Sequence, residues 1–398
     1  MKRASRLIRA AFPILMSCGL VVAGAGSTRV GEVRPHKAET PHPYPLGTDE
    51  RSVVWTDRVI SPGAEFIRVH FTRFSLAAGD KVTVSSPDGS QVWTYTSRGP
   101  HGKGDIWAFA IDGDEAIVSL HGGRGNGHGY AIEELGHGTS KLDVKEPGPS
   151  LEVICGTDGR EDAACHQGDS GFDVAQRPVA RLLYTSGGFQ YLCTGSLVAG
   201  SNASTMMTNN HCIATQQEAS SLQATFNFQR TTCGGATNAA TTNFAGGTLL
   251  KTNSVNRKGR KGGLDYTLMT LLGNPEATWG ELVPLSRNPI AGELMWFIQH
   301  PGGNQKAVGH WEDGSHSVRC KIDTVGATYS TSATGSQAGY GCDSEGGSSG
   351  SPILAAGTTK AIALHHFGGV GSNPCLNSGT MMSRVCADAG SLLSCSAN

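Results

Sequence analysis

The stretch Gly347-Ser348-Ser349-Gly350-Ser351-Pro352 decides how this chain is interpreted. Its glycines allow a tight backbone turn that presents a serine hydroxyl, as a serine nucleophile requires. Two segments precede it: Thr208-Asn209-Asn210-His211-Cys212, and Asp265-Tyr266-Thr267-Leu268-Met269, in which an aspartate opens an apolar run. The order His, Asp, Ser is one of the known chain orders of a catalytic triad. The three segments together predict a serine-based acyl-transfer site.

The predicted roles follow from the chemistry of a weak nucleophile. A serine hydroxyl needs a base within hydrogen-bond reach and a third group that orients the base. We expect Ser349 to attack a carbonyl carbon, His211 to take the serine proton, and Asp265 to orient the imidazole. The backbone N–H groups of Gly347 and Ser349 are the expected oxyanion hole. Taken singly, each residue has an ordinary alternative, such as a surface histidine, a capping aspartate or a Gly-Ser loop.

Composition and charge restrict the class of protein. The net charge of −1 gives no electrostatic case for binding nucleic acid or an anionic membrane. Glycine is abundant, at 55 of 398 residues, and only 16% of residues are charged. Short apolar runs between Gly, Ser, Thr and Asn predict an all-β protein with tight turns.

The first 25 residues predict a secretion signal. A basic start is followed by the apolar stretch Ala10–Val22 and by Ala23-Gly24-Ala25, a small-residue cleavage pattern. The apolar stretch is too short to span a bilayer. We therefore expect a secreted protein without stable membrane association. Lipid attachment at Cys18 is a minor alternative.

The cysteines mark a domain boundary. Of the 11 cysteines, Cys18 lies in the predicted signal, and the other ten fall between Cys155 and Cys395. An even number in an exported chain predicts a disulfide framework. The sequence thus divides into a signal (1–25), an N-terminal β-rich region with linker (26–150) and a cysteine-containing domain (151–398).

Alternating apolar and polar residues predict strands in both larger parts. In the N-terminal part they predict a small antiparallel sandwich between a Pro- and His-rich lead-in (26–48) and a Gly-rich linker (121–150). Its predicted strands are Glu65–Phe71, Asp80–Ser85, Trp107–Ile111 and Ala116–Leu120. In the C-terminal part the predicted strands are Arg181–Ser186, Gln190–Val198, Gln223–Phe228, Leu249–Asn253, Tyr266–Leu272, Met295–His300 and Lys360–His365, with one short helix around Ala387–Leu393.

From about residue 150 to 395 the chain resembles the bacterial trypsin-like serine proteases, in particular the lysyl endopeptidases. The matching segments are Cys193–Val198, Asn227–Cys233 and Gly347–Pro352. The resemblance implies a secreted serine endopeptidase that acts on protein or peptide substrates. It also implies a two-barrel, chymotrypsin-like fold, with His211 and Asp265 on the first barrel and Ser349 on the second.

Disulfide pairings also follow from the resemblance. It implies Cys193–Cys212, Cys165–Cys233 and Cys155–Cys375. Sequence proximity alone suggests the two remaining pairs, Cys320–Cys342 and Cys386–Cys395. One departure is that Thr208-Asn209-Asn210 stands where the family usually has small residues before the histidine.

The resemblance implies a substrate pocket beside the nucleophile loop. In trypsin-like proteases the residue six before the nucleophile lies at the pocket base. Here it is Asp343, followed by Ser344, which predicts cleavage after Arg or Lys. A second prediction rests on His366-Phe367-Gly368, which resembles the pocket wall of glutamyl endopeptidases and would favour Glu. The alternative for Asp343 is a loop acid held by its neighbours.

The activation switch of animal trypsins is not expected. Ser348 stands where those enzymes have the aspartate that pairs with the new N-terminal amine. Residues 26 to about 145 are a possible pro-region that assists folding or blocks the site. Cleavage after Lys141 or Lys145 would release the mature enzyme.

Two other classes of function are alternatives to a serine endopeptidase. A catalytically silent relative could use the N-terminal sandwich for binding. A serine esterase of the α/β-hydrolase type is disfavoured, because that family runs Ser, Asp, His along the chain. No metal motif is expected, since His300, His365 and His366 lack ligand spacing with acids. No cofactor is predicted, and a monomer is expected.

Overall fold

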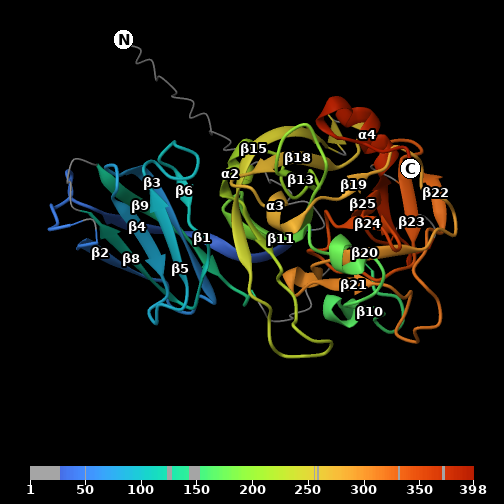
Figure 1. The fold of residues 1–398 in the computed structure, drawn as a ribbon, viewed down its shortest axis with the longest axis horizontal. Coiled ribbons are helices and arrows are strands. Elements are labelled where there is room, and N and C mark those ends of the chain that lie inside the picture. Colours follow the sequence, from blue (N-terminus) through green and yellow to red (C-terminus); the bar gives the residue numbers. More distant parts are fainter. Residues whose placement is uncertain are drawn as a thin grey trace, which may run out of the picture.

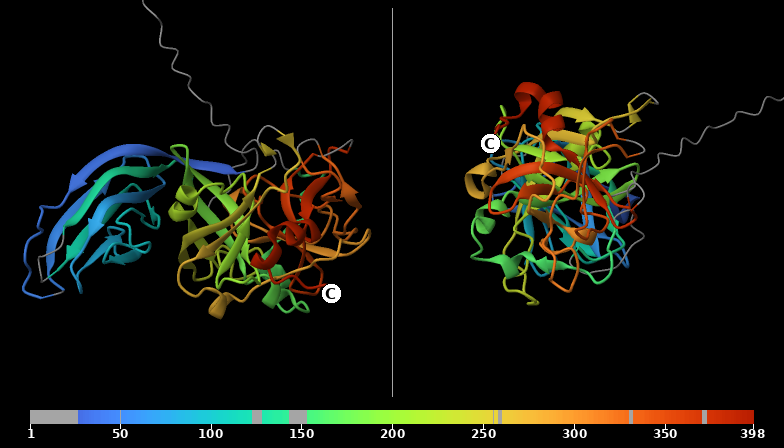
Figure 2. Two further views of the ribbon diagram at one scale, coloured as in Figure 1. Left: turned by 90° about the horizontal axis from the view of Figure 1, so that it is seen from above. Right: turned by 90° about the vertical axis from the view of Figure 1, so that its right-hand side faces the viewer.

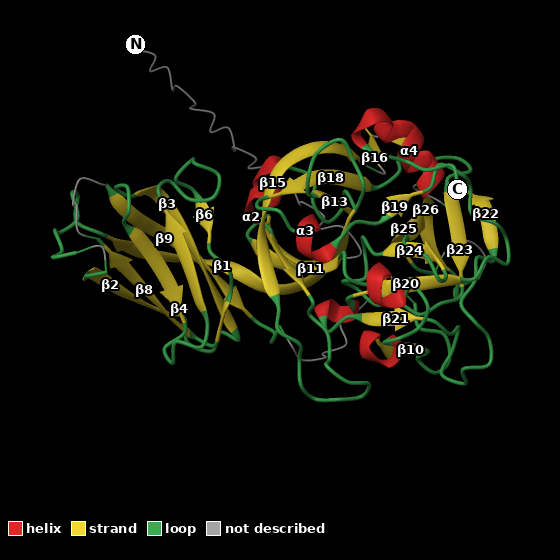
Figure 3. Ribbon diagram, viewed as in Figure 1, coloured by secondary structure: helices red, strands yellow, loops and turns green. Residues whose placement is uncertain are grey.

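The computed structural model describes residues 27–49, 51–122, 128–142, 153–254, 256–257, 260–329, 332–369 and 373–398. The predicted secretion signal, Cys18 and Lys145 lie outside these residues. Figures 1 and 3 show that strands, and not helices, are the main regular structure of the described chain. No helix within the described ranges is long and apolar enough to cross a membrane.

The N-terminal part is a sandwich of two antiparallel layers (Figure 1). One layer has the order β2(Val53–Ile60), β8(Glu115–His121), β4(Lys81–Ser85), β5(Val92–Thr96). The other contains β1(Thr28–Glu39), β9(Gly129–Gly138) and β3(Phe66–Ser75), with the short strands β6(Ile106–Trp107) and β7(Ile111–Asp112) on β3. In β8 every second side chain is buried, as expected for a strand with one face on a core. The sandwich predicted for this region is confirmed.

The lead-in and linker predictions need correction. The lead-in contains β1, and the linker contains β9, which pairs with both β1 and β3. Proline disfavoured a strand in the lead-in because it cannot donate to a ladder. The β1–β9 ladder changes register between Pro35 and Ala38, so the proline lies at an irregularity.

The first unit of the C-terminal part is a closed six-stranded barrel. Its strands follow the order β11(Val179–Ser186), β14(Gln223–Phe226), β15(Thr242–Asn253), β18(Tyr266–Leu271), β13(Thr205–Thr208), β12(Phe189–Leu197), and β12 pairs with β11. Apolar side chains fill its interior. They include Leu182, Tyr184, Leu197, Met206, Ala224, Phe226 and Met269.

The second unit is a nine-stranded sheet. Its order is β10(Arg160–Asp162), β21(Ala307–Gly309), β20(Met295–Gln299), β24(Pro352–Ala355), β25(Lys360–Phe367), β26(Asn377–Met381), β23(Gln337–Tyr340), β22(Thr324–Ala327), with β19(Val283–Pro284) parallel to β25. A separate hairpin joins β16(Asn256–Arg257) and β17(Arg260–Lys261). The all-β, chymotrypsin-like class is thus confirmed.

Helices are short and peripheral to these sheets. They are α1(Phe172–Ala175), α2(Gln216–Ser221), α3(Glu276–Trp279), α4(Met382–Ala389) and the 3₁₀ turns η1(Ala163–His166), η2(Pro301–Gly303) and η3(Gly390–Leu392). The helix predicted around Ala387–Leu393 begins five residues earlier, at Met382. Its buried residues Met382, Val385, Cys386 and Ala389 follow the spacing of one helical face.

The sandwich and the first barrel share one continuous sheet. β1 pairs with β9 in the sandwich and with β12 in the barrel, where Thr28 lies opposite Leu192 and Glu32 opposite Phe189. Figure 2 shows β1 as the long strand that runs from the sandwich into the barrel. In Figure 1 the sandwich lies on the side of the first barrel away from the second sheet.

Polar contacts reinforce this junction. Arg68 of β3 is fully buried, and its guanidinium donates to Ala108 O, Gln190 Oε1 and Ser221 O. Gln190 lies in barrel strand β12, and Ser221 lies in α2, which also belongs to the C-terminal part. A buried cation of this kind is retained only where acceptors satisfy its N–H groups. The sandwich therefore packs against the barrel through specific contacts.

The ten cysteines of the C-terminal part form five disulfides. The pairs are Cys155–Cys375, Cys165–Cys233, Cys193–Cys212, Cys320–Cys342 and Cys386–Cys395. All five predicted pairings are confirmed.

Candidate active site

The predicted base and its orienting acid are in contact. His211 follows β13 and Asp265 precedes β18, and these strands are neighbours in the first barrel. His211 Nδ1 lies 2.7 Å from Asp265 Oδ2, and the His211 backbone N–H donates to Asp265 Oδ1 at 3.0 Å. The Asp265 carboxylate therefore holds both the backbone and the ring of His211. The ring contact is made through Nδ1, as in a catalytic triad.

Asp265 is fully buried, and the surrounding residues stabilise its charge. Burial alone would raise the pKa of Asp265, but the charges and N–H groups of His211 and His366 lower it well below its usual range. Its φ of +50° is unusual for a residue other than glycine. Asn209 Nδ2 donates to the Asp265 backbone carbonyl at 2.9 Å. Asn209 thus positions the acid, so this departure from the family pattern has a structural role beneath the site.

His366 is a second ring on the same carboxylate. Its Nδ1 lies 3.2 Å from Asp265 Oδ2, and its Nε2 lies 2.6 Å from Gln337 Oε1. Gln337 Nε2 donates to the hydroxyls of Ser336 and Thr380, which themselves donate to backbone carbonyls. The Gln337 oxygen must therefore face the ring, so each His366 ring nitrogen lies next to an acceptor oxygen. Burial lowers the pKa of His366, whereas the Asp265 carboxylate opposes this.

The nucleophile loop joins the second sheet to the first barrel. Ser349 lies shortly before β24. Its carbonyl oxygen accepts from Thr194 N of β12 at 2.9 Å and lies 3.9 Å from Cys212 Sγ. Gly350 has φ +87°, and a Cβ there would lie 2.1 Å from the Thr194 carbonyl oxygen. The loop therefore needs glycine at this position, and Ser349 is held beside the residue that follows His211.

A neutral bridge replaces the ion pair of animal trypsins. Ser348 Oγ donates to Gln299 Oε1 at 2.6 Å, and Gln299 Nε2 donates to the Asp343 carbonyl at 2.9 Å. Both side chains are fully buried. This bridge joins the nucleophile loop to β20. Sequence reasoning missed Gln299 and Gln337, because each lies in a β-strand with no local motif to mark it.

The structure gives Asp343 an internal partner instead of a pocket. Its carboxylate oxygens accept from the backbone N–H groups of Cys155 and Gly159 at 2.9 and 2.8 Å. Its side chain is only 1% exposed, and burial raises its pKa. Ser344 is likewise buried and donates to Asn377 Oδ1 at 2.9 Å. Asp343, the acid expected at the base of a substrate pocket, is thus bonded to the start of the C-terminal part.

The second specificity prediction also changes. Both ring nitrogens of His366, the residue expected to receive a substrate glutamate, contact Asp265 and Gln337 inside the protein. Phe367 stacks on His211, with ring centroids 5.7 Å apart. The partly exposed Gly368 follows Phe367 directly.

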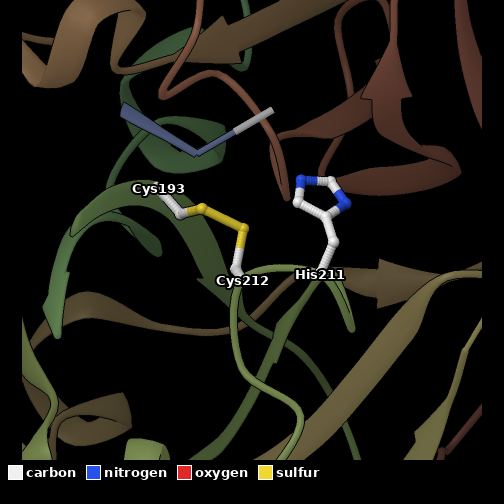
Figure 4. Close-up of side chains that lie close together, drawn as sticks. All are labelled: Cys193, His211 and Cys212. Carbon is white, nitrogen blue, oxygen red and sulfur yellow. A yellow bond between two sulfur atoms is a disulfide. The ribbon is translucent and has the colours of Figure 1, made fainter. Parts of the chain in front are cut away.

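Figure 4 shows His211 beside the disulfide between Cys193 and Cys212. These three residues have the proximity of a metal site. Because both sulfurs are bonded to each other, neither is a thiolate ligand. The disulfide ties the histidine loop to β12.

Comparisons with known proteins agree with this geometry. A family model, the lysyl endopeptidase C-terminal domain, matches residues 157–381, more than half of the chain. The chain belongs to this family. The lysyl endopeptidase of Pseudomonas aeruginosa is 31% identical over 214 residues, which cover 48% of this chain and 41% of that protein.

Other matches extend the comparison. A protein called "Secreted RxLR effector protein 73" of Plasmopara viticola is 28% identical over 360 residues, covering 86% of this chain and 84% of that protein. Among solved structures, a Glu endopeptidase shares 18% identity with a TM-score of 0.40, over 59% of this chain and 96% of that one. The predicted membership of the trypsin-like serine proteases is confirmed.

Proposed function

We propose that this family member is an active secreted serine endopeptidase with the triad His211, Asp265 and Ser349. The observation that carries the proposal is the contact between His211 and Asp265, next to a nucleophile loop contributed by the other sheet. The name of the Plasmopara relative, which includes "Secreted", supports export.

The proposed reaction is acyl transfer in two steps. Ser349 Oγ attacks the carbonyl carbon of the scissile bond while His211 Nε2 takes the serine proton. The resulting imidazolium is stabilised by Asp265, and its proton passes to the leaving amine. Water then hydrolyses the acyl-enzyme by the same route. The N–H groups of Gly347 and Ser349 are the proposed oxyanion donors, and the φ of +96° at Gly347 supports the tight turn this role needs.

The preference at P1, the residue before the scissile bond, is a separate proposal. In the sequence, Asp343 predicts cleavage after Arg or Lys, and His366 predicts cleavage after Glu. Both side chains are about 1% exposed and bonded internally. We therefore propose that neither residue sets P1 selectivity by charge. Phe367 and Gly368 are the proposed lining of the substrate groove.

The N-terminal region is proposed to assist folding and not to block the site. Its sandwich adds a strand to the far side of the first barrel. Lys141, one of the two proposed cleavage points, is exposed. N-terminal sequencing of the secreted protein tests whether cleavage occurs there; a start near Gly26 would refute it.

The decisive test is labelling with a serine-directed fluorophosphonate, followed by a peptide panel that varies only at P1. We expect labelling and cleavage by the wild type and neither by Ser349→Ala. A second candidate is a silent protease-like binding protein, favoured by the similarity of both parts of the chain to an effector. A folded wild type that takes no label would support that candidate.

A further inference from the structure

The turn η2 fixes the peptide unit that carries one of the proposed oxyanion donors. The Gly302 backbone N–H donates to the Gly346 carbonyl at 2.7 Å. This carbonyl and the Gly347 N–H belong to the same planar peptide unit, so they point in opposite directions and turn together. A Cβ on Gly347 would lie only 2.8 Å from Gly303 N, so η2 also packs directly against the loop. The position of η2 therefore sets the direction of the Gly347 N–H.

Two barrel residues hold η2 in place. The guanidinium of Arg181, in β11, donates to the Gly303 carbonyl at 3.4 Å. Gly303 also packs on Leu192 of β12, because a Cβ at this glycine would lie 2.1 Å from Leu192 Cδ1. Arg181 is only 5% exposed, and its guanidinium lies over the Phe228 ring, 3.8 Å from the ring centroid. Stacking and hydrogen bonding together restrict where a planar guanidinium can lie.

The end of the N-terminal region reaches the same guanidinium. Arg181 Nη1, the nitrogen that contacts Gly303, also donates to the Leu142 carbonyl. The Leu142 side chain is buried in one apolar cluster with Leu192. Leu142 is thus tied to η2 twice, through Arg181 and through Leu192. Because Leu142 directly follows Lys141, the proposed cleavage point, both ties would stay with the protease after the cut.

We propose that Arg181 and Leu142 are positioning residues for the oxyanion hole, an inference that rests on the proposed endopeptidase function. Together they hold η2 where its bond to the Gly346 carbonyl directs the Gly347 N–H toward the developing oxyanion. Both side chains are buried and act through η2. The end of the linker is therefore a working part of the protease as well as a tether to the sandwich.

Arg181→Gln is the main perturbation, because it removes both the charge and the planar guanidinium that η2 contacts. Loss of a complete oxyanion donor costs about 10²–10³-fold in kcat, and we expect a displaced donor to cost about 10–100-fold. An interaction made only in the transition state lowers kcat and leaves KM unchanged. A peptide boronate places an oxygen where the oxyanion forms. Its Ki should therefore rise by a similar factor.

The test measures kcat, KM and the boronate Ki of the full-length protein on the best peptide of the P1 panel. Labelling to completion with the fluorophosphonate counts the competent sites, so unfolded protein does not enter kcat. Leu142→Ala is the second variant, because it removes the apolar anchor and keeps the carbonyl. We expect a smaller fall in kcat for Leu142→Ala, and wild-type kcat for Leu142→Met, which conserves the side-chain volume.

Arg68→Gln is the matched control. Arg68 is also a buried arginine that donates to backbone carbonyls, but its partners lie at the junction of the sandwich and the barrel. This variant should lower Tm and leave kcat unchanged. A fall in kcat with constant KM in Arg181→Gln, absent from Arg68→Gln, would support the inference.

The contrary outcomes separate this inference from the proposed function. Wild-type kcat and boronate Ki in Arg181→Gln would overturn the inference alone, as would an equal fall in kcat in Arg68→Gln. If Arg181→Gln does not fold, as judged by Tm, Leu142→Ala decides, and an unchanged kcat there would overturn the inference. A folded wild type that takes no label and cleaves no peptide would overturn both the inference and the endopeptidase function.

Discussion

Asp343→Asn separates a structural role from a specificity role. The wild-type carboxylate accepts two backbone N–H bonds, at 2.9 and 2.8 Å. An asparagine keeps one acceptor oxygen and turns an NH₂ group toward the other donor. Losing one hydrogen bond to a charged group costs about 1.5–3 kcal/mol. For a domain of this size, Tm should fall by roughly 3–12 °C.

The assay combines unfolding with peptide cleavage. Calorimetry of the Ser349→Ala background gives the change in Tm, and the P1 panel in the active protein gives the selectivity. We expect lower Tm and an unchanged P1 profile. Asp323→Asn is the control, because Asp323 accepts one backbone N–H bond, from Gly341, and is more exposed. A variant with unchanged Tm that stops cutting after Arg or Lys would refute our interpretation.

Three further predictions concern the packing around the site. Gln223→Leu removes the side-chain oxygen that accepts from the Ala110 backbone N–H of the sandwich at 2.8 Å. The unfolding free energy in urea titrations should fall by about 1–3 kcal/mol. An unchanged urea midpoint would contradict a stabilising contact between the sandwich and the barrel. His366→Asn should raise the depressed pKa of Asp265. A depressed carboxyl pKa stabilises the folded state above about pH 4, and this stabilisation is lost as pH falls. The variant should therefore have a lower unfolding free energy than the wild type at pH 7, and the difference should narrow below about pH 4. A difference that stays constant with pH would contradict this prediction. Replacing Cys193 and Cys212 by alanine opens a loop of 19 residues and should cost about 3 kcal/mol, measured by calorimetry against the variant lacking Cys386–Cys395.

The fold class and the contact between His211 and Asp265 could be predicted because their signals are local. His211, Asp265 and the Gly-Ser turn each carry a short motif, and strands such as β4 and β8 alternate buried and partly buried side chains. The structure confirms the contact between His211 and Asp265. It also confirms the disulfides, which the family pattern and proximity supplied.

The remaining features depend on contacts between distant residues. β1 and β9 lie in segments rich in Pro and Gly, which weaken strand predictions, and they form strands through pairing with each other. Asp343 has the position of a pocket acid, but nothing in its neighbourhood reveals the amides of Cys155 and Gly159, more than 180 residues earlier. The orientation of His366 depends likewise on Gln337, a residue in another strand.

The shared strand β1 has a consequence for what proteolysis would produce. Cleavage near Lys141 would cut the peptide chain but not the ladders that join β1 to β12 and β9, nor the bonds from Arg68 to the barrel. The product would be a two-chain complex that separates on a denaturing gel and migrates as one species on a native gel. Loss of the N-terminal piece would also uncover the β12 edge that β1 now covers, and an uncovered strand edge promotes association with other chains.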